Sequence, residues 1–281
     1  MNRKSLFRDY DQVALDAQYN CRAAVPEHVG FLARWPEASI AARSQLDGVL
    51  DTPYGTHPRA RLDIFPAAVM PSPVLVFIHG GYWQTLDKND FSWIAPPFVA
   101  AGVSVVLVRY PLAPQDDMDS IVGCVHQALR WVGEHVVEFG GDPERVFIAG
   151  HSAGAHLTAT ALLAGGYRYP LLGGCAISGI YELEPIRCSY LNEVVGLNEH
   201  QVNRHSPIRD TATGTPLILA VGSDETDEFL RQHRDYQRTR TDAGDSVTAL
   251  ELPGYHHFSV VEVLADTEGP LFPRIMERLS P

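Results

Sequence analysis

Short, uninterrupted runs of apolar, β-branched residues alternate with helical patterns along most of this 281-residue chain, and this alternation limits the possible folds more than any other feature. Residues 74–78 and 103–108 are two such runs, with the composition of strands buried on both faces. Residues 121–139 instead carry apolar residues three and four positions apart and end at a Gly-Gly pair, which predicts a helix. Strands and helices in this order predict an α/β fold, with a mostly parallel central sheet and helices on both faces.

The remaining segments continue the alternation of strands and helices. We expect further strands at residues 61–65, 145–149, 171–177, 217–221 and 246–252, and further helices at 91–101, 153–163, 226–241 and near the C-terminus. Residues 1–57 have the pattern of a helical or irregular N-terminal extension, broken at Pro26 and Pro36. Residues 181–210 show weak periodicity between two strands, which is typical of a lid or substrate-pocket insert. We therefore predict one domain over residues 1–281, with these two segments as additions to it.

Composition narrows the range of partners. The chain has 34 Asp and Glu against 22 Lys and Arg, a formal net charge of −12, which disfavours nucleic acid and anionic membrane surfaces. Its longest apolar runs are too short to cross a bilayer, and the N-terminus lacks the apolar run of a secretory signal. The cysteines are widely spaced and form no C-x-x-C pair, which argues against a disulfide framework or a zinc site; they are Cys21, Cys124, Cys175 and Cys188. We expect a cytoplasmic protein, a monomer or homodimer, that needs no metal or organic cofactor.

The segment Gly150-His151-Ser152-Ala153-Gly154 fits the pattern G-x-S-x-G. It lies between a predicted strand and a predicted helix, where a serine on a strained turn becomes accessible as a nucleophile and the flanking glycines leave room for neighbouring backbone. The amide of Ala153, at the helix N-terminus, is our first candidate donor to an oxyanion. The alternative is a glycine-rich turn with an idle serine.

His79-Gly80-Gly81-Tyr82-Trp83 directly follows the predicted strand at residues 74–78. This HGG type of loop supplies the second oxyanion donor in lipases and esterases, and we assign that role to the amides of Gly81 and Tyr82. Tyr82 and Trp83 would then lie beside the reacting acyl group as an apolar wall. The alternative is an ordinary β-α turn with an aromatic core pair.

Hydrolases with this serine motif order their catalytic residues as serine, acid and histidine along the chain. The strand at residues 217–221 leads to Asp224, which we choose as the acid, with Glu225 second and Asp227 third. Asp224 could also cap the helix that follows.

The strand at residues 246–252 leads through a flexible Gly254 loop to two adjacent histidines. We choose His257 as the base and keep His256 as the alternative. No HExxH sequence, zinc-ligand spacing or phosphate-binding P-loop is present in the sequence.

Several motifs together resemble a known family. HGGYW at 79–83, GHSAGAHL at 150–157 and SGIYELEPI at 178–186 are similar to the kynurenine formamidase (arylformamidase) branch of the α/β-hydrolase superfamily, which grades into bacterial carboxylesterases; GSDETDEF at 222–229 and GYHHF at 254–258 resemble its acid and histidine segments. RYPLAP at 109–114 and GGDPERV at 140–146 also resemble hormone-sensitive-lipase-like esterases, although HGGY departs from their usual HGGG. The resemblance covers roughly residues 60–270 and implies an α/β-hydrolase fold. It carries over Ser152, Asp224 and His257 as the triad, and the HGG loop with Ala153 as the oxyanion hole.

The motifs predict a serine hydrolase that works through an acyl-enzyme. The resemblance implies that it cleaves a small aryl formamide, of the N-formylkynurenine type, or a carboxylic ester. We expect the leaving group beside the segment from Tyr181 to Arg209, where Tyr181, Tyr190 and Leu191 could contact an aromatic ring. One alternative is a general carboxylesterase without a role in tryptophan breakdown. Another, from a different class, is a hydrolase-fold binding protein that has lost its chemistry.

Overall fold

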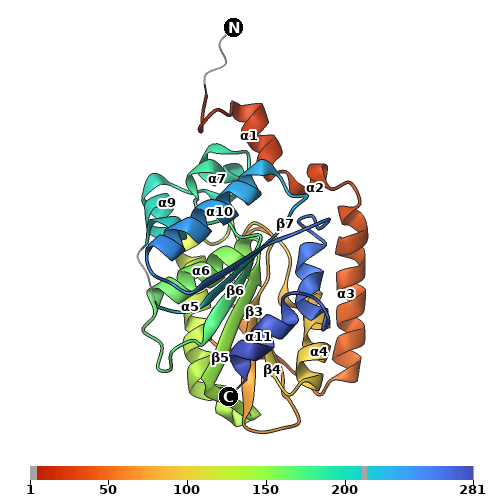
Figure 1. The fold of residues 1–281 in the computed structure, drawn as a ribbon. Helices are drawn as coiled ribbons and strands as arrows, with labels where there is room; N and C mark the ends of the chain where they lie inside the picture. The colour runs from red at the N-terminus through yellow and green to blue at the C-terminus, as the bar shows by residue number, and fades with distance from the viewer. Residues whose placement is uncertain (1–4, 211–213, 281) are drawn as a thin grey trace.

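A twisted, mostly parallel sheet forms the centre of the protein (Figure 1). The computed structural model describes residues 5–210 and 214–280. Within them the strands are β1 Val49–Pro53, β2 Arg61–Phe65, β3 Ser72–Ile78, β4 Ser104–Arg109, β5 Gly141–His151, β6 Gly173–Ile177, β7 Leu217–Gly222 and β8 Val247–Leu252. They follow the order β1-β2-β4-β3-β5-β6-β7-β8. Only β2 with its neighbours β1 and β4 pairs antiparallel among the described strands, which confirms the predicted α/β class.

Helices cover both faces of the sheet, with α5 and α6 on one side and α4 and α11 on the other (Figure 1). The α-helices are α1 Gln12–Tyr19, α2 Cys21–Ala24, α3 His28–Gln45, α4 Ala95–Ala100, α5 Met118–His135, α6 Ala153–Ala164, α7 Glu184–Cys188, α8 Asn192–Val195, α9 Glu199–His205, α10 Asp227–Asp242 and α11 Phe272–Leu279. Short 3₁₀ turns are η1 Lys88–Asp90, η2 Ser92–Ile94, η3 Val136–Phe139, η4 Pro207–Arg209 and η5 Val260–Ala265.

The central strands are apolar because helices cover them on both sides. All the side chains of residues 74–78 are at most 1% exposed. The parallel register then brings the carboxyl ends of these strands to one edge, since Ile78 pairs with Gly150 and His151 pairs with Ile177. Residues that follow β3, β5, β7 and β8 therefore leave the sheet on the same side, which is where ligand sites of such sheets lie.

Three features differ from the expectations drawn from sequence. Strand β1 has no counterpart among the predicted elements, because its residues are mostly exposed at the sheet edge and carry no alternating pattern. The prediction that Pro36 breaks a helix is wrong: it lies inside α3, whose buried residues Phe31 and Trp35 pack on the core and keep the helix intact around the missing amide. The segment 181–210, expected to have little structure, contains α7, α8, α9 and η4.

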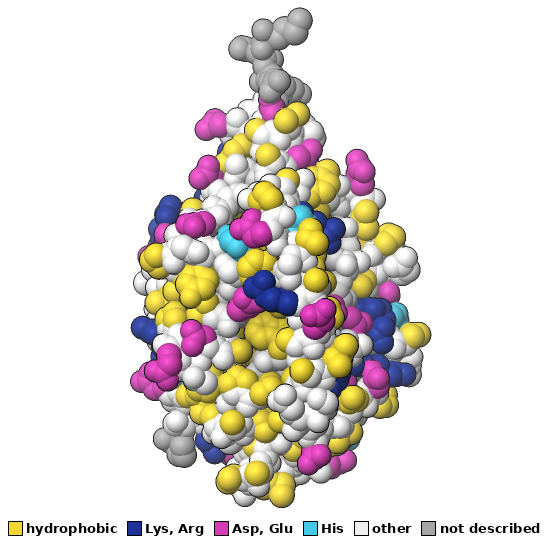
Figure 2. Space-filling view, turned by 90° about the vertical axis from the view of Figure 1, so that its right-hand side faces the viewer, with side chains coloured by type: hydrophobic (Ala, Val, Ile, Leu, Met, Phe, Trp, Pro, Cys, Tyr) yellow, Lys and Arg dark blue, Asp and Glu magenta, His cyan; other side chains and the backbone are white. Residues whose placement is uncertain are grey.

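The N-terminal extension packs on the rest of the protein. Helices α1 and α2 lie over one end of the sheet, and α3 runs along its side (Figure 1). Figure 2 shows that the face covered by α3 mixes acidic, basic and hydrophobic side chains. Over residues 5–210 and 214–280, every helix is too short or too polar to cross a membrane.

Candidate active site

Ser152 occupies the sharp turn between the end of β5 and the start of α6. Its backbone has φ 57° and ψ −119°, a conformation that a non-glycine residue adopts only under strain. The two flanking glycines make this turn possible. A Cβ added to Gly150 would lie 2.2 Å from the carbonyl oxygen of Gly154, and one added to Gly154 would lie 2.0 Å from the carbonyl oxygen of Ile78. The turn predicted from the G-x-S-x-G pattern is therefore present, with the serine held in a strained conformation.

His257 and a buried carboxylate line up with this serine. The Nε2 atom of His257 lies 3.1 Å from Ser152 Oγ, and its Nδ1 atom lies 2.7 Å from Glu225 Oε2. A carboxylate only accepts, so Nδ1 carries the proton and Nε2 is free to accept the hydrogen of the serine hydroxyl. The side chain of Glu225 is fully buried, and that of His257 is 8% exposed.

The expected acid, Asp224, does not contact the histidine. Its side chain is exposed and accepts a hydrogen bond from Ser223 Oγ at 2.8 Å. The next residue along the turn after β7, Glu225, points inward instead, where its Oε1 accepts from the amide of Gly222 at 3.0 Å and from the hydroxyl of Ser178. The structure thus replaces Asp224 with Glu225, the second choice from the sequence, as the partner of the histidine.

Asp227 and His256 have different surroundings from Glu225 and His257. Asp227 is the exposed first residue of α10. The ring of His256 packs edge-on against Phe31 with 5.0 Å between ring centroids, and its Nε2 lies 3.5 Å from Glu27. His256 therefore faces the N-terminal helices, and His257 is the histidine beside the serine.

Opposing effects set the charge state of His257. Burial disfavours its imidazolium form, but the Cys21 thiol and the Glu225 carboxylate outweigh this effect and raise the pKa of His257. Burial and the neighbouring His257 instead lower the pKa of His151 well below its usual value, so His151 stays neutral. Its Nε2 donates to the carbonyl oxygen of His257 at 2.9 Å, which holds the backbone of His257 in place.

The HGG loop turns sharply beside the serine. Gly81, Tyr82 and Trp83 have positive φ angles of 107°, 49° and 57°. A Cβ on Gly81 would lie 2.2 Å from the carbonyl oxygen of Thr85, so this position requires glycine.

The loop also approaches the serine closely, because a Cβ built on Gly80 would lie 3.1 Å from Ser152 Cβ. Within the described residues, the amides of Gly81, Tyr82 and Ala153 donate to no protein acceptor. Ala153 N–H is the first amide of α6, where the helix dipole adds partial positive charge. These three donors remain our candidates for the oxyanion hole.

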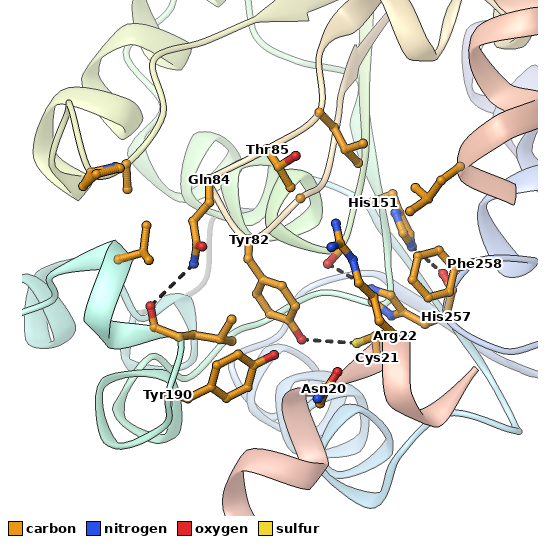
Figure 3. A pocket seen from close by; sticks show the side chains of 18 of the residues that line it. Asn20, Cys21, Arg22, Tyr82, Gln84, Thr85, His151, Tyr190, His257 and Phe258 are labelled. Carbon is orange, nitrogen blue, oxygen red and sulfur yellow. Dashed lines mark hydrogen bonds between the residues drawn. The ribbon is translucent and has the colours of Figure 1, made fainter. Parts of the chain in front are cut away.

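A cavity of about 530 Å³ opens onto the serine and the histidine (Figure 3). Tyr82, Gln84 and Tyr190 lie on one side of it, and His257 and Arg22 on the other. Its lining residues are Asn20, Cys21, Arg22, Leu32, Trp35, Gly81, Tyr82, Gln84, Thr85, Leu86, Ala113, Pro114, Gln115, His151, Ser152, Tyr190, Leu191, Val194, His257 and Phe258. Tyr82, Tyr190 and Leu191 therefore line the cavity, and their contact with substrate stays a prediction.

Two other predicted substrate contacts are wrong. Trp83 is fully buried beneath the loop and packs edge-on against His156, with 5.1 Å between ring centroids. Tyr181 is also fully buried and stacks on Tyr236 at 4.1 Å. Neither residue lines the cavity.

Sequence reasoning missed the contribution of the N-terminal extension. Five residues from this segment line the cavity: Asn20, Cys21, Arg22, Leu32 and Trp35. The thiol of Cys21 lies 3.2 Å from the hydroxyl of Tyr82, which also donates to the carbonyl oxygen of Tyr19 at 2.8 Å. No motif marks these positions. Ser178, which supports Glu225, was also missed, although it begins one of the segments that carried the family resemblance.

The described residues, 5–210 and 214–280, contain no group of three or more His, Cys, Asp or Glu side chains placed to hold a metal ion.

Comparison with known proteins relates this chain to a family of known fold and to curated relatives that match nearly its whole length. The α/β-hydrolase fold family matches residues 75–189. Kynurenine formamidase of Danio rerio is 31% identical over 278 residues, which cover 95% of this chain and 92% of that protein. Kynurenine formamidase of Salmo salar is 30% identical over 293 residues, covering 100% of this chain and 97% of that protein.

Solved structures agree with the fold. A candidate thioesterase from Silicibacter superimposes with a TM-score of 0.82 at 27% identity, covering 93% of this chain and 98% of the other. An esterase from Mycobacterium marinum shares the fold with a TM-score of 0.71 at 18% identity, covering 94% and 92%. With near-complete coverage of relatives at 30% identity and above, this chain is a hydrolase that belongs to the kynurenine formamidase family of α/β hydrolases.

Proposed function

We propose that this hydrolase cleaves small aryl formamides of the N-formylkynurenine type through Ser152, His257 and Glu225 and a formyl-enzyme. The observation that carries the proposal is the aligned arrangement of the three side chains. Ser152 Oγ lies 3.1 Å from His257 Nε2, and His257 Nδ1 lies 2.7 Å from Glu225 Oε2, all beside one cavity. This is the geometry of a nucleophile, its base and an orienting acid.

In the first half of the reaction, Ser152 Oγ attacks the formyl carbon while its proton passes to His257 Nε2. Glu225 stabilises the imidazolium, and the amides of Gly81, Tyr82 and Ala153 bind the oxyanion; losing one such donor typically costs about 10²–10³ in rate. The intermediate collapses when the C–N bond breaks, and His257 returns its proton to the leaving arylamine.

In the second half, water replaces the amine. His257 takes a proton from the water as its oxygen attacks the formyl ester of Ser152. The second tetrahedral intermediate releases formic acid, and the proton on His257 returns to Ser152 Oγ. One water is consumed, and one amine and one formic acid are produced, so the enzyme is restored; the formic acid ionises to formate and a proton in solution.

Two features favour a formyl group over longer acyl groups. The hydroxyl of Tyr82 is held between Tyr19 O at 2.8 Å and Cys21 Sγ at 3.2 Å, so this wall of the cavity has little freedom to move away. The relatives matched over nearly the whole chain are kynurenine formamidases. Formyl is the smallest acyl group, and a fixed wall discriminates against larger ones.

A second candidate is a general carboxylesterase, because ester and formamide hydrolysis pass through the same kind of tetrahedral intermediate. A plant isoprenylcysteine methylesterase from Arabidopsis thaliana is 35% identical over 116 residues, 39% of this chain, which supports shared hydrolytic machinery. The third candidate, a binding protein without chemistry, conflicts with the alignment of Ser152, His257 and Glu225.

Changing Ser152 to alanine tests the proposal. We expect Ser152→Ala to lower kcat by about 10⁴–10⁶, while circular dichroism and the thermal midpoint remain close to those of the wild type. The assay should follow N-formylkynurenine, p-nitrophenyl acetate and p-nitrophenyl butyrate, with fluorophosphonate labelling as an independent readout.

The choice of substrates separates the three candidate functions. Preference for N-formylkynurenine supports the formamidase, and activity on the two esters alone supports the carboxylesterase. An unlabelled wild-type protein would favour the silent binding protein, and full activity in purified Ser152→Ala would refute the proposed nucleophile.

A further inference from the structure

The cavity contains one fixed charge. Of its described lining residues, Arg22 is the only Lys, Arg, Asp or Glu. This is unexpected in a chain with a net charge of −12, where acidic side chains outnumber basic ones. The guanidinium of Arg22 is also unpaired with any carboxylate among the described residues. Figure 3 shows the side chain extending from α2 over the cavity that His257 faces.

Several buried contacts fix the backbone that carries Arg22. The hydroxyl of Tyr19 donates to Glu228 Oε2 at 2.9 Å and accepts from Gln232 Nε2 at 2.8 Å, and all three side chains are at most 1% exposed. On the other side, the carbonyl oxygen of Tyr19 accepts the hydroxyl of Tyr82 at 2.8 Å. The short segment that joins α1 to α2 is thus tied both to α10 and to the HGG loop.

The same segment brings Arg22 near the reacting groups. Its neighbour Cys21 contacts Tyr82 and is close enough to His257 to influence the pKa of that histidine. Arg22 also acts across the cavity, because its charge lowers the pKa of Tyr190 against the larger raising effects of burial, Cys21 and Asp16. An aromatic substrate between Ser152 and Tyr190 would therefore lie within the field of this cation.

We propose that Arg22 binds a carboxylate on the leaving-group side of the substrate, so that the enzyme selects aryl acyl compounds that carry a carboxylate over neutral ones. Guanidinium and carboxylate form paired, charge-assisted hydrogen bonds, and Arg22, an exposed residue that lines the cavity and has no carboxylate partner among the described residues, suits that role.

This inference adds a substrate class to the proposed function and rests on it for the reaction, but it can be tested separately. Two matched pairs of substrates serve this purpose. The formamide pair is N-formylkynurenine and its carboxamide, and the ester pair is 4-acetoxybenzoate and 4-acetoxybenzamide. In each pair only the charge of one group changes.

The variants are Arg22→Gln, which removes the charge, and Arg22→Lys, which keeps it. Arg168→Gln is the control, because Arg168 is exposed, lies outside the cavity and its loss changes the net charge equally. We expect Arg22→Gln to lower the preference for the carboxylate member, as a ratio of kcat/KM values, by about 10- to 100-fold, mainly through KM. Arg22→Lys should keep most of the preference, and Arg168→Gln should keep all of it.

The two substrate pairs distinguish failure of the formamidase proposal from failure of the proposed role of Arg22. Wild-type turnover of the ester pair alone would refute the formamidase proposal while still measuring the role of Arg22. Equal losses on both members of a pair, or no carboxylate preference in the wild type, would overturn the role of Arg22.

Binding provides a readout that needs no turnover. Calorimetry with kynurenine and kynurenine carboxamide on the full chain should show tighter binding of the carboxylate, and the difference should vanish in Arg22→Gln. An unchanged difference in that variant would also overturn the inference.

Discussion

The carboxylate paired with His257 is fully buried, and this determines how the site should titrate. Glu225 receives hydrogen bonds from Gly222, Ser178 and His257, so its negative charge is stabilised without access to water. Together with the neighbouring Cys21, a charge in this position favours the imidazolium of His257 and raises the pKa of that ring despite its burial. The base must be neutral to accept the serine proton, so a raised pKa moves the onset of activity to higher pH.

Glu225→Gln tests this coupling. We expect kcat/KM of the wild type to rise with pH through a midpoint above 6.5, the ordinary pKa of histidine. Removing the anion should lower the pKa of His257, shift this limb toward lower pH and reduce the maximal kcat by about 10³–10⁴. The measurement is a pH profile of kcat/KM for each protein.

Asp224→Asn is the matched control, because it makes the same kind of change one residue away on an exposed side chain. Its activity should stay within about twofold of the wild type at every pH. A large loss in Asp224→Asn with little loss in Glu225→Gln would return the acid to Asp224.

The contacts around Ser152 and Glu225 show which parts of the site could be predicted from sequence. Ser152 was identifiable because its motif is local: the glycines two residues away on each side meet backbone that any such turn brings close. The choice between Asp224 and Glu225 depends on which way a short turn points after β7, and this is settled by Gly222 and by Ser178, 47 residues away in sequence from Glu225. Strand-end position alone does not contain that information.

At the level of elements, the tight crossing of α6 over β3 places the serine. Gly154 lies where a Cβ would be 2.0 Å from the carbonyl oxygen of Ile78, which is backbone of a fully buried strand and has no room to retreat. We expect Gly154→Ala to destabilise the fold by about 1–3 kcal/mol or more and to lower activity by displacing Ser152. Urea unfolding and the ester assay measure the two effects.

Gly123→Ala is the control for that substitution. Gly123 lies within α5 with no atom within 4 Å of an added Cβ, so alanine should stabilise the protein by about 0.5–1 kcal/mol through helix propensity. A Gly154→Ala variant as stable as the wild type would contradict the close packing of α6 on β3.

Elements were predictable from the sequence to different degrees for physical reasons. The buried strands β3, β4 and β7 stand out because both faces are apolar. The helices α7, α8 and α9 have at most seven residues each, too few for a periodic pattern to show, and they are held by contacts such as Ser206 Oγ with Leu183 N at 3.0 Å. The place of α2 at the cavity depends on Tyr19 contacts with Glu228, 209 residues away in sequence.

At the scale of the whole molecule, the burial of many histidines predicts a strong dependence of stability on acid. Burial lowers the pKa of His79, His126 and His233 to about 4 and that of His156 to about 3. A histidine in the unfolded chain has a pKa near 6.5. Below that pH the unfolded chain therefore binds protons that the folded protein does not bind. These groups contribute stability that is complete above pH 6.5 and is lost as the pH falls toward 4. His257 acts in the opposite sense, because its raised pKa favours folding at low pH, but it is one group against several.

We therefore expect the free energy of unfolding to fall steeply below pH 6.5, whereas between pH 7 and pH 8 the raised pKa of His257 makes it decrease as the pH rises. Each histidine that stays neutral in the folded state contributes a slope of up to about 1.4 kcal/mol per pH unit, so several together exceed the effect of any surface ion pair. Urea unfolding at half-unit steps from pH 8 to pH 5 measures the slope, and the slope gives the number of protons taken up on unfolding. An uptake of two or more protons near pH 5.5 would agree with neutral, buried histidines, since carboxylates are still mostly ionised there. A stability that did not change between pH 7 and pH 5 would mean that these rings reach water or a counter-charge in the folded protein, and the burial of His79 and His156 would have to be revised.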